Sequence, residues 1–180
     1  MNSALKSLLL FVLLAAPGFA AATDFADTKK KAEAGNPMAQ WLLGFIYSHG
    51  NGVPKDSAEA AKWFRKAADQ GFARAQLNLG WFYTNGEGVP KDSAEAVKWF
   101  RLAAEQGDAD AQGSLGMMYY IGTGVPIDFV QAHVWFNIAA ANGNEAAKPG
   151  LESVQNEMTS EQKAEAMKLA RDLFAKLPKG

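Results

Sequence analysis

The side chains that most often carry out chemistry in proteins are sparse in this sequence. It has two histidines, His49 and His133, and no cysteine. The histidines lie far apart, and neither belongs to an HxxxH or HExxH pattern. Without cysteine there is no disulfide, no thiolate metal ligand and no cysteine nucleophile. We therefore expect no catalytic residue, no metal site and no cofactor.

The aspartates have a simpler explanation than acid–base catalysis. Asp56 is followed three residues later by Glu59, and this spacing is typical of a capping box at the start of a helix. The same spacing recurs in Asp92 with Glu95 and in Asp128 with Gln131. A glycine-rich segment precedes each pair, but its spacing is not that of a phosphate-binding loop. The aspartates are thus predicted to start helices.

The composition is that of one globular domain. Of the 180 residues 48% are hydrophobic, which is enough for a sizeable core. The formal net charge is -1, so the protein has no strongly basic surface. A nucleic acid is therefore not expected as a partner.

The N-terminus has the features of a secretory signal peptide. Lys6 precedes an unbroken apolar run over residues 8–16. Small residues follow at Gly18-Phe19-Ala20 and Ala20-Ala21-Ala22, where a signal peptidase could cleave. The alternative is a membrane anchor, but the run is well short of the ~20 apolar residues that a spanning helix needs. We predict a signal peptide over residues 1–22, and an exported protein, periplasmic or secreted, without stable membrane insertion.

The rest of the chain repeats itself every 36 residues. Each copy contains AQxxLGxxY, then GxGVPxD, then AxxWFxxAAxxG. The period predicts stacked two-helix units, and we place their boundaries at residues 36–71, 72–107 and 108–143. Residues 23–35 are predicted to form an N-terminal capping helix, and residues 144–180 C-terminal capping helices. In the latter, Thr159 and Gln162 form a capping box, and one stripe contains Met167, Ala170 and Phe174.

These three motifs resemble the Sel1-like repeats, which are relatives of the tetratricopeptide repeats. The resemblance covers Asn36 to Gly143. It implies an all-α fold, a right-handed α-solenoid of stacked helix-turn-helix repeats. It also implies an adaptor or scaffold for other proteins.

Within the units, two sets of positions recur for structural reasons. Gly44, Gly80 and Gly116 lie in the middle of predicted helices, where glycine costs ~1 kcal/mol relative to alanine. A cost repeated in every unit indicates a close helix contact in which a side chain would clash. Basic residues of the second helices are expected to form a solvated convex face: Lys62, Arg65, Lys66, Lys98 and Arg101.

Positions that differ between units are free to recognise a partner. On the first helix of each unit, the spacing i, i+3, i+7, i+10 traces one face. By resemblance to the tetratricopeptide repeats this face is concave. It carries large apolar residues that are unusual at a surface unless covered. The candidate partner-binding residues are Met38, Trp41, Phe45, Arg74, Leu77, Asn78, Trp81, Thr84, Met117 and Tyr120, and Ser48, Asp110 and Gly113 share the face.

The resemblance and the concave face together predict a non-catalytic scaffold that binds a protein or peptide as a monomer. Two alternatives stay open, a cell-envelope hydrolase and a protein that binds glycan or peptidoglycan. For Trp41 and Phe45 a structural role is also open, in which they pack against the N-terminal helix.

Overall fold

A computed structural model describes residues 17–178 of the chain, and all regular structure in this part is α-helical. Most of the predicted signal peptide lies outside the described residues. The helices are α2 (Pro17–Glu33), α3 (Pro37–His49), α4 (Ser57–Asp69), α5 (Ala73–Asn85), α6 (Ser93–Glu105), α7 (Ala109–Ile121), α8 (Phe129–Ala141), α9 (Ala147–Asn156) and α10 (Ser160–Phe174). The predicted all-α fold is confirmed.

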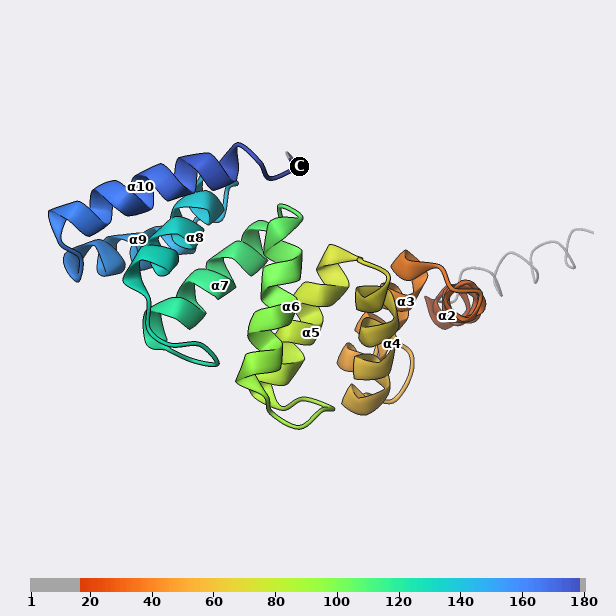
Figure 1. The fold of residues 1–180 in the computed structure, drawn as a ribbon. Helices are drawn as coiled ribbons and strands as arrows, with labels where there is room; N and C mark the ends of the chain where they lie inside the picture. The colour runs from red at the N-terminus through yellow and green to blue at the C-terminus, as the bar shows by residue number, and fades with distance from the viewer. Residues whose placement is uncertain (1–16, 179–180) are drawn as a thin grey trace, which may run out of the picture.

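The helices form a solenoid in which consecutive pairs stack side by side (Figure 1). The three repeats are the pairs α3 with α4, α5 with α6 and α7 with α8. Helix α2 covers one end of the array, and α9 and α10 cover the other, with α10 lying against α8. Each pair buries one face against its neighbour, so the core runs the length of the molecule.

The motif GxGVPxD ends one helix and starts the next. Gly50 has a φ of 72°, a left-handed conformation that favours glycine, and its N–H donates to the carbonyl of Ile46. Asp56 then accepts a hydrogen bond from the backbone N–H of Glu59 at 2.9 Å. The aspartates at the start of α6 and α8 accept equivalent bonds, so their predicted capping role is confirmed.

The mid-helix glycines make room for aromatic rings. A Cβ added at Gly116 would lie 2.8 Å from the ring of Phe136, and Phe136 is fully buried. Gly44 and Gly80 meet the rings of Phe64 and Phe100 in the same way. The predicted close contact is confirmed, and its partner in each case is the phenylalanine of the motif WF.

Buried glutamines of the AQ motif connect neighbouring units. Gln76 donates through Nε2 to the carbonyl of Ala68 in the preceding unit, at 3.1 Å. Its Oε1 accepts from Gln106 at 2.7 Å. Gln40 and Gln112 make equivalent bonds, which satisfies three amides that would otherwise be costly to bury.

The prediction that Arg65 and Arg101 lie on a solvated face is wrong. The guanidinium of Arg65 lies 4.9 Å from the ring centroid of Trp99 and hydrogen bonds to the hydroxyl of Tyr83, both in the next unit. Arg101 bonds to Tyr119 in the same way. The helical period places these residues at the edge of the apolar stripe, and stacking of the next unit covers that edge.

The C-terminal helices pack on the last repeat. Thr159 and Gln162 form the predicted capping box. Helix α10 packs on α8 through Ala166 and Ala170, which are buried, and through Leu173. Met167, Ala170 and Phe174 share one face, as predicted, and line a common hollow with Asn137 of α8. Only Ala170 of the three is buried, since 54% of Met167 and 37% of Phe174 remain exposed.

Candidate functional site

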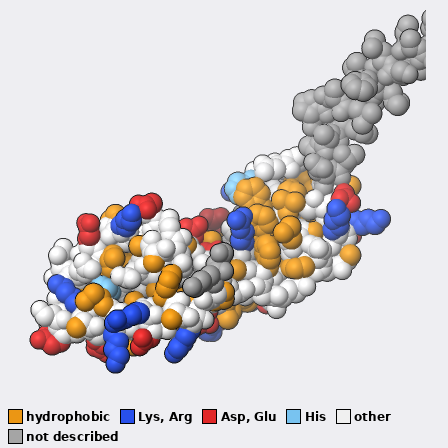
Figure 2. Space-filling model, turned by 90° about the horizontal axis from the view of Figure 1, so that it is seen from above, with side chains coloured by type: hydrophobic (Ala, Val, Ile, Leu, Met, Phe, Trp, Pro, Cys, Tyr) orange, Lys and Arg blue, Asp and Glu red, His pale blue; other side chains and the backbone are white. Residues whose placement is uncertain are grey.

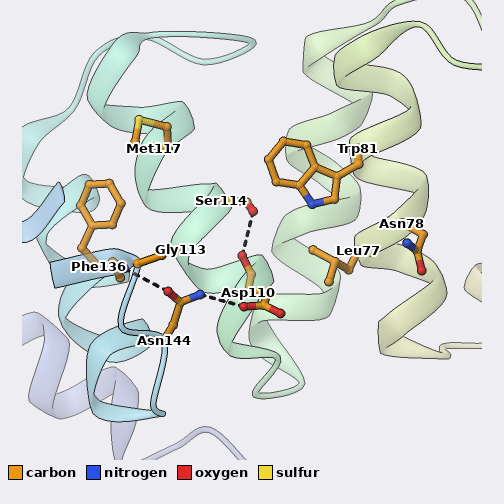
Figure 3. A pocket seen from close by; sticks show the side chains of 11 residues that line it. Leu77, Asn78, Trp81, Asp110, Gly113, Ser114, Met117, Phe136 and Asn144 are labelled. Carbon is orange, nitrogen blue, oxygen red and sulfur yellow. Dashed lines mark hydrogen bonds between the residues drawn. The ribbon is translucent and has the colours of Figure 1, made fainter. Parts of the chain in front are cut away.

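A hollow of about 450 Å³ lies between α5 and α7. We call it the α5–α7 groove (Figure 3). Its walls come from the first helices of two successive units, and its floor includes Phe136 from α8. It is lined by Leu77, Asn78, Trp81, Asp110, Gly113, Ser114, Met117, Phe136, Asn144, Ala146 and Ala147.

Trp81 is the largest side chain in the groove and is held firmly. It is 45% exposed, while its ring meets the buried Phe100 edge to face at a centroid distance of 5.4 Å. In Figure 3 its ring points from α5 toward α7. Met117, 43% exposed, lines the same groove from α7. A supported indole and a flexible thioether are side chains well suited to anchor a partner.

The polar edge of the groove is built around Asn144. Its Nδ2 donates to a carboxylate oxygen of Asp110 at 2.9 Å, and its Oδ1 accepts from the N–H of Ala147 at 3.0 Å. Ser114 donates to the backbone carbonyl of Asp110 at 2.7 Å. These bonds join α7 to the segment that leads into α9 and fix the position of the Asp110 carboxylate.

Asp108 caps α7 close to this edge. It accepts a hydrogen bond from the N–H of Ala111 at 2.9 Å. Burial raises the pKa of Asp108 above its ordinary value, against the opposing effects of the Ala111 bond and the positive charge of Arg74. Asp108 therefore caps α7 and does not line the α5–α7 groove.

A second hollow, the Trp41–Arg74 hollow, lies between α3 and the start of α5. Trp41 donates through Nε1 to Oδ1 of Asn78 at 2.8 Å, which ties the first unit to the second. The guanidinium of Arg74 lies 5.8 Å from the Trp41 ring centroid. The hollow is lined by Met38, Trp41, Gly71, Phe72, Ala73, Arg74 and Gln106.

Figure 2 shows hydrophobic side chains gathered over the N-terminal half of the molecule. Trp41 and Phe45 are half-buried and pack on the core of the second unit, beside Phe72. Phe45 also stacks on His49 at a centroid distance of 4.0 Å. The alternative of packing against the N-terminal helix is wrong, because α2 meets α3 through Phe25 and Tyr47 instead.

The structure brings most of the sequence-predicted residues into these two hollows. The α5–α7 groove holds Leu77, Asn78, Trp81 and Met117, and the Trp41–Arg74 hollow holds Met38, Trp41 and Arg74.

The other three predicted residues, Phe45, Thr84 and Tyr120, line neither hollow. Thr84 donates its hydroxyl to the carbonyl of Gly80, and Tyr120 packs beside Phe129.

Seven groove residues were missed by the sequence analysis or left off its candidates: Asp110, Gly113, Ser114, Phe136, Asn144, Ala146 and Ala147. Asp110 shares the predicted face but was not selected. Asn144 follows Asp108 by the repeat period of 36 residues, so the repeat phase was a usable signal. Ser114 follows the predicted residue Asn78 by the same period, so it also had a usable signal. Phe136 carried none, since it belongs to the WF motif, which the repeat assigns to the core.

The described residues give no indication of a metal site or a membrane span. Between residues 17 and 178, no three His, Cys, Asp or Glu side chains come together in a way that could hold a metal ion. No helix in this part of the chain is long and apolar enough to cross a membrane.

Comparison with known families matches the three repeats directly. The Sel1 repeat model matches residues 37–72, 73–108 and 109–144. The chain belongs to the Sel1 repeat family. Repeats of this family typically mediate protein–protein interaction, and the proteins that carry them are generally non-catalytic scaffolds.

Solved Sel1 repeat proteins share the fold of this one. A Sel1 repeat protein from Oxalobacter formigenes is 36% identical, with a TM-score of 0.66, over 74% of this chain and 58% of that one. The protective antigen c5321 of uropathogenic Escherichia coli is 32% identical, with a TM-score of 0.66, over 85% of this chain and 41% of that one. Cysteine-rich protein B of Helicobacter pylori is 25% identical, with a TM-score of 0.58, over 70% and 93%.

A curated relative is the secretory immunoglobulin A-binding protein EsiB of Escherichia coli O6:H1. It is 42% identical over 58 residues, which are 32% of this chain and 12% of EsiB. This chain therefore covers only a small part of EsiB. It covers about half the length of the first two solved relatives.

Proposed function

We propose that this Sel1 repeat protein is an exported, non-catalytic scaffold that binds a protein or peptide on its concave face. The observation that carries the proposal is the α5–α7 groove. It presents Trp81 and Met117 to solvent although both are large and apolar. Partly exposed aromatic and methionine side chains in a hollow are enriched where proteins bind one another.

Two further features support the proposal. Hydrogen bonds fix the positions of polar groups at one edge of the groove. Such groups can orient a bound partner. The predicted signal peptide supports export. The name of EsiB describes it as a protein that binds secretory immunoglobulin A, which is consistent with an extracellular binding function for the repeats.

Photocrosslinking tests the groove directly. A photoreactive side chain is placed at Met117 in the groove or at Lys62, which is exposed and ion-paired on α4. We expect a discrete protein adduct from the Met117 position in intact bacteria, and none from the Lys62 position. Adding Trp81→Ala to the Met117 variant should abolish the adduct, because the anchor is lost.

The same experiment has a clear contrary result. Equal adducts from both positions, unaffected by Trp81→Ala, would show that the groove is not the binding face. Absence of any protein adduct from the groove would contradict the scaffold function and leave the hydrolase and glycan-binding alternatives for assay.

A further inference from the structure

We infer that the α5–α7 groove accepts a basic side chain, arginine or lysine, from the partner. This rests on the proposed function, since it specifies the chemistry of the segment that the scaffold binds. The inference starts from the charge of the lining. Asp110 is the one charged residue among the eleven that line the groove.

The carboxylate of Asp110 has capacity for a further partner. One of its oxygens accepts the bond from Asn144. None of the ion pairs found among the described residues includes Asp110. It lies exposed at the start of α7, so its charge is open to a cation from outside the chain. Charge-assisted hydrogen bonds to such a carboxylate are among the stronger polar contacts.

The rest of the lining suits the remainder of a basic side chain. Arginine and lysine bury their aliphatic stems on apolar surfaces while the charged head stays in polar surroundings. Leu77 and Met117 provide such a surface, and the exposed Trp81 ring can also attract a cation. In Figure 3 Trp81 and Leu77 lie on one wall, and Asp110 lies across the groove from them.

Other occupants fit the groove less well. An acidic side chain would be repelled by the Asp110 carboxylate, and the lining contains no cation that could bind it. A purely apolar side chain would contact Trp81 and Met117 but would give the Asp110 carboxylate no partner beyond Asn144. The basic side chain is the one that satisfies both halves of the lining.

Selection from a random peptide library tests this chemistry without a known partner. The full chain is used to select from displayed 12-residue peptides, in parallel with its Asp110→Asn and Trp81→Ala variants. Asparagine keeps an oxygen acceptor for Asn144 and removes only the charge. We expect the wild-type protein to enrich arginine or lysine next to apolar residues, and Asp110→Asn to enrich the apolar residues alone.

Binding of a single selected peptide makes the effect quantitative. Asp110→Asn should weaken binding of the peptide about 2- to 5-fold, as loss of a solvent-exposed ion pair predicts. The control Asp69→Asn removes the same charge at an exposed position on α4 outside the groove, and should have no effect. Added salt should weaken the wild-type complex and leave the Asp110→Asn complex nearly unchanged.

The outcomes separate this inference from the proposed function. If enrichment depends on Trp81 but contains no basic residue, or persists in Asp110→Asn, the basic-side-chain inference is wrong and the groove remains a binding site. If no peptide is enriched in a Trp81-dependent way, the proposed function itself fails, and this inference fails with it.

Discussion

At the scale of single residues, the buried histidine of the third unit has no counterpart in the others. His133 occupies the position held by Ala61 and Val97 in the first two units. It is buried between α8 and the C-terminal helices, with its Nε2 3.2 Å from Nε2 of Gln155. Its Nδ1 has no partner among the described residues. Burial, and to a lesser extent the charge of Lys163, lower the pKa of His133.

This lowered pKa predicts acid sensitivity. Because the folded state disfavours the protonated ring, the contribution of neutral His133 to stability is present above its ordinary pKa of about 6.5 and is lost as pH falls through the folded-state pKa. We expect the melting temperature to fall between about pH 7 and pH 5 by more in the wild type than in His133→Gln. Parallel melting curves in both proteins would contradict this.

Substitution of two glycines in α7, one at a time, tests how closely this helix packs against Phe136. Gly116→Ala places a methyl group against Phe136, and Gly150 also lies close to this ring and limits the space into which it could move. We expect a loss of about 1–2 kcal/mol in the free energy of unfolding, after allowing for the better helix propensity of alanine.

The matched control is Gly113→Ala, three residues away on the same helix. A Cβ there would meet only the side-chain amide of Asn144 at 3.3 Å. Urea unfolding should show Gly113→Ala equal to or more stable than the wild type. Equal losses in both variants would mean that the Phe136 contact does not limit residue size in α7.

At the scale of helices, the second helix of each unit contacts the neighbouring units while the first helix carries the proposed binding face. Trp99 on α6 is 9% exposed and lies under the Arg65 guanidinium of the preceding unit. Trp81 on α5 has the same chemistry but is nearly half exposed. Trp99 thus belongs to the contact between units, whereas Trp81 lies on the proposed binding face.

Truncation of the two tryptophans should separate these roles. We expect Trp99→Ala to cost ~3–5 kcal/mol, as large-to-small changes in a core do. Trp81→Ala should leave helicity and most of the stability intact, since much of its surface is already in water. The measurement is thermal unfolding followed by circular dichroism. If Trp81→Ala unfolds as easily as Trp99→Ala, the groove belongs to the core.

At the scale of the whole molecule, the array is held by packing and hydrogen bonds without disulfides, and both of its ends are covered. With no cysteine in the sequence, stability depends on contacts between neighbouring units. Helix α2 covers the first unit through Ala32 and Phe25, and α10 covers the last through α8. The covered ends leave the sides of the solenoid, among them the proposed binding face, in contact with solvent.

The proposed export gives a prediction for the N-terminus of the protein. We expect the protein recovered from the periplasm or culture medium of a bacterial host to begin after Ala20 or Ala22, the positions at which the signal peptide is predicted to end. Mass spectrometry of the intact protein measures this. Recovery in the membrane fraction with residues 1–20 still attached would favour an anchor instead.

The sequence alone determined the solenoid, because its period, its helix caps and its mid-helix glycines are local features that recur in every unit. It also placed Trp81 and Met117 on one face, since helical spacing decides which residues share a side. Only the tertiary structure decided which of these residues share a hollow. The angle between units covers Arg65, brings Phe136 and Asn144 to the groove, and leaves Thr84 and Tyr120 outside it, and no local pattern contains that angle.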